Sequence, residues 1–146
     1  MNGTFFEVQI LDRCTFLNHD YFSYRRSLQI ARESQPRGWD PCDPHIQAAN
    51  DLHYFVFEAM GIEEIESLKL YTALNTPLDY YHGVDCFFEF NGEVVTIDLT
   101  LNLNKPDVKA DVRIDDQIID DDKNIRENYM KELAREIAKD FMRKAS

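Results

Sequence analysis

The clearest pattern in this chain is an alternation of apolar and polar residues in its second half. The strand predicted over 93–103 has an apolar residue at every second position from Val95 onward, the period of a half-buried β-strand. A run of β-forming residues over 84–90 precedes it, and the intervening Asn91-Gly92 pair is typical of a tight hairpin turn. Shorter alternating runs predict a third strand over 108–114 and an N-terminal strand over 4–11.

Apolar spacings of three and four residues predict the helices. They are expected over 20–33, 44–60, 62–74 and 123–143. Asp20 and the Asp43-Pro44 pair are typical helix starts, and Gly61 is a typical helix end. Between the first two helices, three prolines and a glycine predict a loop in which Trp39 packs on the core.

The order of these elements predicts one α+β domain covering residues 1–146. Its sheet is expected to have three antiparallel strands built around the hairpin, with the N-terminal strand as a candidate addition. Helices should cover the sheet. The last helix, through Leu133 and Ile137, is expected to lie on the apolar side of the 93–103 strand.

Composition narrows the classes of function. The net charge of −11 weighs against a general nucleic-acid coat or a protein that binds anionic membranes. No apolar run approaches the roughly 20 residues of a membrane span, and no signal peptide is visible. Three scattered cysteines are typical of reduced thiols, so a cytoplasmic location is expected.

Two aspartates on the hairpin are the main candidates for chemistry. A two-residue turn at Asn91-Gly92 places Asp85 opposite Asp98, with both side chains on one face about 5 Å apart. Thr100 shares that face. The face is either the solvent side of an antiparallel sheet or a site where a cation such as Mg²⁺ offsets the repulsion between the carboxylates. Aspartate is disfavoured inside strands, which favours the second interpretation.

The run Gly83-Val84-Asp85, the hairpin, and Asp98-Leu99-Thr100 resemble the core motif of the PD-(D/E)XK nuclease superfamily. That family has an acid at the start of one strand and acid-x-Lys on its antiparallel neighbour. Its fold core runs helix, three strands, helix, strand. The resemblance implies a restriction-endonuclease-like fold in which Asp85 and Asp98 bind Mg²⁺ or Mn²⁺.

The same resemblance assigns three further positions. Glu58, on the preceding helix, would be the supporting acid and third metal ligand. Thr100 occupies the position of the family's lysine, and Lys105 or Lys109 would have to replace that lysine. The expected function is a metal-dependent nuclease that cleaves or binds DNA phosphodiesters, with a degenerate or inactive site.

An acidic run offers an alternative function. Residues 111–122 contain six aspartates and one arginine. They form either a solvated loop that stabilises the start of the last helix or a surface that imitates DNA phosphates. The second interpretation predicts a non-enzymatic inhibitor or accessory protein that binds a basic protein partner. Three arginines on the first helix, Arg25, Arg26 and Arg32, are either a solvated helix face or contacts for phosphate.

Overall fold

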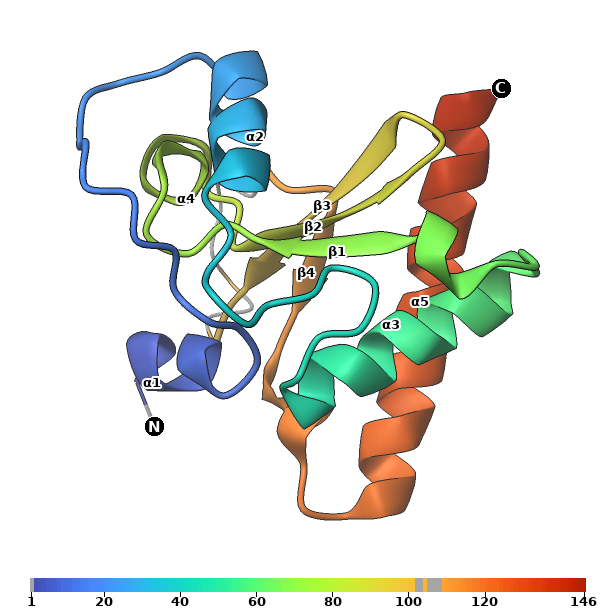
Figure 1. Cartoon of the computed structure of the whole chain (residues 1–146). Coiled ribbons are helices and arrows are strands. Elements are labelled where there is room, and N and C mark those ends of the chain that lie inside the picture. Colours follow the sequence, from blue (N-terminus) through green and yellow to red (C-terminus); the bar gives the residue numbers. More distant parts are fainter. Residues whose placement is uncertain (1, 102–103, 105–108) are drawn as a thin grey trace.

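A four-stranded mixed sheet forms the centre of the molecule in a computed structural model that describes residues 2–101, 104 and 109–146 (Figure 1). The strands lie in the order β1 (Lys69–Thr72), β2 (Cys86–Phe90), β3 (Glu93–Leu99) and β4 (Val112–Ile114). The first three are antiparallel neighbours, whereas β4 runs parallel to β3. The expected α+β class is therefore confirmed.

The predicted hairpin is present. Asn91 and Gly92 both have positive φ, 50° and 78°, as a two-residue turn of the primed type requires. Phe90 pairs with Glu93, and the register continues without a bulge to Cys86 opposite Ile97.

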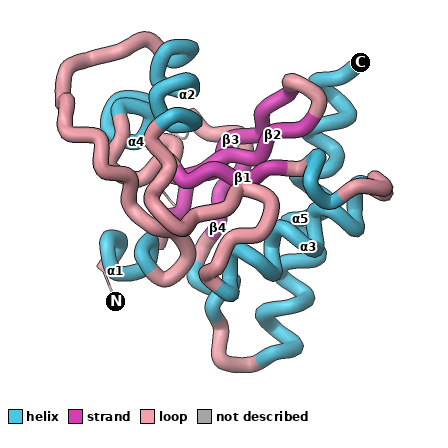
Figure 2. Tube along the Cα trace, in the orientation of Figure 1, coloured by secondary structure: helices cyan, strands magenta, loops and turns pink. Residues whose placement is uncertain are grey.

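Helices cover both faces of the sheet (Figures 1 and 2). On one face, α3 (Gln47–Met60) and α5 (Lys123–Ala145) enclose the main apolar core with Phe88, Val95 and Ile97. On the other, α2 (Tyr24–Glu33) and α4 (Pro77–His82) pack around Phe87 in a smaller cluster. Adjacent residues of a strand point to opposite faces, so Phe87 and Phe88 mark the two layers.

Several sequence predictions are confirmed. The last helix begins after Asp122, whose carboxylate accepts hydrogen bonds from the Asn124 and Ile125 N–H groups. Leu133 and Ile137 are buried in the core beneath β3. Gly61 ends α3 in the left-handed conformation. Trp39 is buried, and its indole N–H donates to the Leu70 carbonyl at 3.0 Å.

The N-terminal strand predicted over 4–11 is wrong, because this segment contains the helix α1 (Gly3–Val8). Asn2 caps the helix by accepting a hydrogen bond from the Phe5 N–H. Phe6 and Ile10 are both buried, and their four-residue spacing suits a helix as well as a strand. A short apolar run does not distinguish the helical period of 3.6 residues from the strand period of two residues.

The helix predicted over 62–74 is also wrong. A single 3₁₀ turn, η1 (Ile65–Ser67), leads into β1, where Leu68, Leu70 and Thr72 are buried at alternate positions. Pairing of β1 with β2 supplies its backbone hydrogen bonds. The three-residue steps that predicted a helix were therefore overridden by a tertiary contact.

The sheet consequently differs from the three-stranded antiparallel sheet expected from the sequence. Of the strand predicted over 108–114, residues 112–114 form β4. Residues 105–108 lie outside the described part of the chain, as do residues 102–103 of the strand predicted over 93–103. After β4, the short 3₁₀ helix η2 (Asp116–Ile119) leads into α5.

Candidate functional site

Asp85 and Asp98 lie close together at the end of the β2–β3 hairpin, where the charge of Asp98 acts on Asp85. Asp85 directly precedes Cys86, which pairs with Ile97, and Asp98 directly follows Ile97. The Asp85 N–H donates at 2.8 Å to the carbonyl of Ile97, the residue that already pairs with Cys86, so the regular pairing ends at Cys86. Both aspartates lie on the face of Phe87, beneath α2 and α4.

This face is not a solvent face. Asp85 is 4% exposed and Asp98 is 5% exposed, and Thr96 and Thr100 beside them are also buried. The solvent-face interpretation is therefore wrong, because α2 and α4 cover the side of the sheet that an isolated antiparallel hairpin would present to water. Burial of ionisable groups requires a partner or a change in charge.

Asp79, on α4, supplies a third carboxyl group. It is partly exposed, and it forms a hydrogen bond with the Asp85 side chain. The Asn75 N–H also donates to Asp79 Oδ2 at 3.1 Å, which fixes this carboxylate at the first turn of the helix. Sequence reasoning missed Asp79, although Thr76-Pro77 is a helix-start signal of the kind noted at Asp43-Pro44.

The three carboxyls change one another's protonation. Burial, followed by the charges of Asp79, Glu7 and Asp98, raises the pKa of Asp85 to about 9, against the hydrogen bond that Leu99 N–H donates to it at 2.7 Å. Burial also raises the pKa of Asp79, although the hydrogen bonds from Asn75 and Asp85 and the charge of Arg13 oppose this shift. The raised pKa of Asp85 favours its protonated form, which can donate a hydrogen bond to the Asp79 carboxylate.

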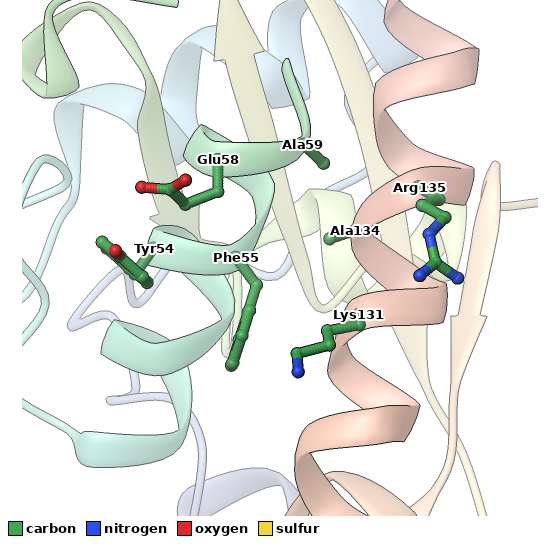
Figure 3. Close-up of a pocket in the computed structure, with 7 residues that line it drawn as sticks. All are labelled: Tyr54, Phe55, Glu58, Ala59, Lys131, Ala134 and Arg135. Carbon is green, nitrogen blue, oxygen red and sulfur yellow. The ribbon is translucent and has the colours of Figure 1, made fainter. Parts of the chain in front are cut away.

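The structure does not bring Glu58 to this cluster. Glu58 projects from α3, on the opposite face of the sheet, and lines a groove of about 520 Å³ between α3 and α5 (Figure 3). Its carboxylate bonds the Tyr54 hydroxyl. The resemblance assigned Glu58 because it precedes the hairpin on a helix, but α3 packs on the wrong side of the sheet. Asp79 and Glu7 are the acids that the fold places near Asp85 instead.

Thr100 and Lys109 have different environments. Thr100 is buried just beyond β3, where its N–H donates to the Ile114 carbonyl at 2.9 Å. Lys109 is exposed, and no hydrogen bond or ion pair within the described residues joins it to Asp85 or Asp98. Lys105 lies outside the described residues.

The donor set suits a hard cation, but the present spacing is that of carboxyls sharing a proton. All three groups offer oxygen ligands, which Mg²⁺ and Mn²⁺ prefer. Within residues 2–101, 104 and 109–146, no group of three or more His, Cys, Asp or Glu side chains is spaced to hold a metal ion. A cation would have to displace the proton between Asp79 and Asp85 and draw the carboxylates together.

Much of the acidic run has local structural roles. Asp111 pairs with Lys144 of α5 and accepts hydrogen bonds from the Thr96 N–H and hydroxyl. Asp115 caps the 3₁₀ helix η2, and Asp122 caps α5. These contacts favour the interpretation of a loop that stabilises the start of the last helix.

The arginines of α2 divide into two groups. Arg32 bonds Glu89 on β2 and lies over the Phe87 ring at 5.8 Å. Arg25 and Arg26 are exposed at the start of the helix, and neither forms an ion pair within the part of the chain that the structure describes. Among the arginines of α2, Arg25 and Arg26 are therefore the two that could contact a phosphate.

No protein-family model, curated protein or solved structure matches this chain. Among the described helices, none is long and apolar enough to cross a membrane.

Proposed function

We propose that this chain is a metal-dependent phosphodiesterase of the nuclease type that acts on DNA. The observation that carries the proposal is the buried cross-strand pair Asp85–Asp98, joined by the Asp79 carboxyl. Burying carboxylates costs free energy, and a bound cation would offset that cost. A buried cluster of carboxyl groups is therefore a candidate functional site. Asp79, Asp85 and Asp98 would hold Mg²⁺ or Mn²⁺.

The order of elements supports the resemblance to the PD-(D/E)XK superfamily in part. A helix, α3, is followed by three antiparallel strands, and the two aspartates lie at the second and third of these. The final two elements are reversed, because β4 precedes α5 whereas the family has a helix before its last strand. The observed order and the four-stranded mixed sheet therefore depart from the expected restriction-endonuclease-like fold, and the proposal rests on the acidic cluster.

When bound, the cation would lower the pKa of a coordinated water and stabilise the charge that develops on the phosphate. The chain itself must first release the proton held by Asp85, so cation affinity is expected to increase as pH rises. Thr100 has a hydroxyl but no charge where the family has lysine, which predicts slow cleavage.

The test is thermal unfolding of wild type and Asp98→Asn with Mg²⁺, against NaCl of matched ionic strength. A cation that binds only the folded state stabilises it by about 2.7 kcal/mol at 100 times its Kd. For a chain of this length, that raises the Tm by roughly 5–10 °C. Asp98→Asn should lose this response and any cleavage of DNA, because an amide cannot replace an anionic oxygen ligand.

Asp121→Asn is the matched control, since Asp121 is an exposed aspartate outside the cluster. It should respond to Mg²⁺ as wild type does. Identical shifts in wild type and Asp98→Asn would refute the metal site. The remaining proposal would then be that the acidic run, residues 111–122, is a surface that binds a basic protein partner.

A further inference from the structure

A group of exposed aromatic rings lies beside the acidic cluster. Its members come from α4, from the segment that precedes α2 and from the first residue of α2; α4 and this segment lie side by side in Figures 1 and 2. We call this surface the tyrosine patch; it consists of Tyr21, Tyr24, Tyr80, Tyr81, His19 and His82. The exposed fractions of the four tyrosines range from 37% for Tyr81 to 67% for Tyr21.

The rings of the patch are held in place by one another. Tyr21 contacts Tyr81 edge to face at 5.3 Å between ring centroids and also contacts His82 at 5.8 Å. The Tyr81 hydroxyl donates to the His19 carbonyl, and His82 Nε2 bonds the Phe22 carbonyl at 2.9 Å. These contacts hold the rings in a fixed arrangement while leaving Tyr21 two-thirds exposed.

A short chain of contacts joins the patch to the acidic cluster. The Tyr80 hydroxyl donates to Asn75 Oδ1, and the Asn75 N–H donates to Asp79. Asn75 has a φ of 68°, a left-handed conformation that asparagine tolerates better than most residues.

The segment that carries Tyr21 and Tyr24 is basic, although the α4 side of the patch adjoins Asp79. Residues 13–26 include three arginines and one aspartate, whereas the net charge of the whole chain is −11. Arg25 and Arg26 directly follow Tyr24 and are exposed. Clustered aromatic rings next to unpaired arginines are the combination that binds single-stranded nucleic acid, where unpaired bases stack on rings and phosphates contact cations. The bases of a duplex offer no free faces for such stacking.

We propose that the tyrosine patch binds single-stranded nucleic acid, with a base stacked on Tyr21 and adjacent phosphates contacted by Arg25 and Arg26. The patch would hold the strand next to Asp79, the partly exposed member of the acidic cluster. The binding stands on the patch alone, whereas the delivery to the acids rests on the proposed nuclease function.

The test is fluorescence anisotropy of a labelled oligothymidylate of about 12 nucleotides, within the range that a single-strand-binding domain covers. EDTA is present, so that binding is measured without metal or cleavage. Wild type should bind this strand more tightly than a duplex of the same length. Tyr21→Leu, which removes the ring but keeps an apolar side chain, should weaken binding roughly tenfold.

Three variants act as controls. Tyr21→Phe keeps the ring and should bind as wild type does. Tyr54→Leu removes a tyrosine of similar exposure, 49%, from α3 on the other side of the sheet, and should also bind normally. Arg25→Gln combined with Arg26→Gln should weaken binding and reduce its dependence on salt, because two phosphate contacts are lost.

The proposal is overturned if wild type does not bind the strand, if Tyr21→Leu binds as wild type does, or if duplex and single strand bind equally. Its failure is distinguishable from failure of the nuclease function. Binding that depends on Tyr21 without cleavage in Mg²⁺ leaves the patch intact and removes the nuclease. Cleavage that needs Asp98 but not Tyr21 would support the nuclease function and refute binding at the tyrosine patch.

Discussion

The two faces of the sheet are both buried, but they differ in chemistry. The face toward α3 and α5 is apolar, with Val95, Ile97 and Leu99 of β3 packed against Leu133 and Ile137. The same strand presents Thr96 and Asp98 to the opposite face, and Thr100 continues it, all less than 8% exposed. Alternation along one strand therefore separates an apolar layer from a polar one, although neither layer faces water.

The difference indicates a division of roles. The apolar layer stabilises the fold by removing hydrocarbon from water. The polar layer keeps two opposed aspartates out of water, which is unfavourable unless one is neutral or a cation is bound. The raised pKa of Asp85 favours the first of these outcomes, a neutral carboxyl, in the absence of a cation.

The largest effect is expected from the apolar layer. Leu133→Ala should lower the free energy of unfolding by about 2–5 kcal/mol, because Leu133 is 4% exposed and its truncation leaves a cavity against β3. Urea unfolding of both proteins measures the difference. Leu17→Ala is the matched control, since Leu17 is 80% exposed and its loss should change stability by under about 0.5 kcal/mol. A loss below about 1 kcal/mol for Leu133→Ala would contradict the assignment of this layer as the core.

The polar layer should make the free energy of unfolding depend on pH. Folding raises the pKa of Asp85 from 3.8 to about 9, so the folded chain binds this proton and the unfolded chain releases it between those values. Stability should therefore fall as pH rises through this window, by up to about 1.4 kcal/mol per pH unit for this group. Asp85→Asn keeps an acceptor for the Leu99 N–H and a donor for Asp79, and should remove this loss.

Urea unfolding of wild type and Asp85→Asn between pH 5 and pH 9, about the range of this window, measures the effect. The variant should gain stability over wild type as pH rises. Asp121→Asn, in the exposed acidic run, should follow wild type at every pH. Parallel curves for wild type and Asp85→Asn would show that the Asp85–Asp79 pair does not share a proton.

The smallest effect is expected at the edge of the polar layer. Burial raises the pKa of Asp111, but the hydrogen bonds from Lys144 and Thr96 outweigh it, so the pKa is lowered overall. The Lys144 and Asp111 side chains are about a quarter exposed, and solvent weakens their pairing. Lys144→Met should destabilise the protein by about 0.5–1 kcal/mol, and less in high salt. A loss that does not change with salt would indicate packing by the lysine stem rather than charge.

The sequence predicted the parts of the fold that local interactions decide. Asn91-Gly92 adopts a tight turn because both residues tolerate positive φ, and this turn sets the register of β2 and β3 as far as Cys86 opposite Ile97. The helix after Asp122 likewise has its own cap and a long apolar stripe. Each of these signals operates within a few residues, so neighbouring elements do not change it.

Short apolar segments without such signals depended on the rest of the molecule. The segment 69–72 became a strand because the edge of β2 offered it hydrogen bonds, and residues 3–8 became a helix although their alternation suited a strand. The side of the sheet on which α3 and α4 pack was equally invisible in the sequence, unlike that of α5. Because α3 and α4 lie on opposite faces of the sheet, Glu58 lies outside the candidate site and Asp79 lies within it.

The sequence by itself determined the hairpin and its register from Phe90–Glu93 to Cys86–Ile97, because a two-residue turn and a two-residue period leave one arrangement. Only the tertiary structure decided that Asp85 and Asp98 are buried, which third carboxyl joins them, and that the pKa of Asp85 is raised. Those properties arise from α2 and α4 covering the polar face, since desolvation and mutual repulsion depend on what lies across the sheet rather than along the chain.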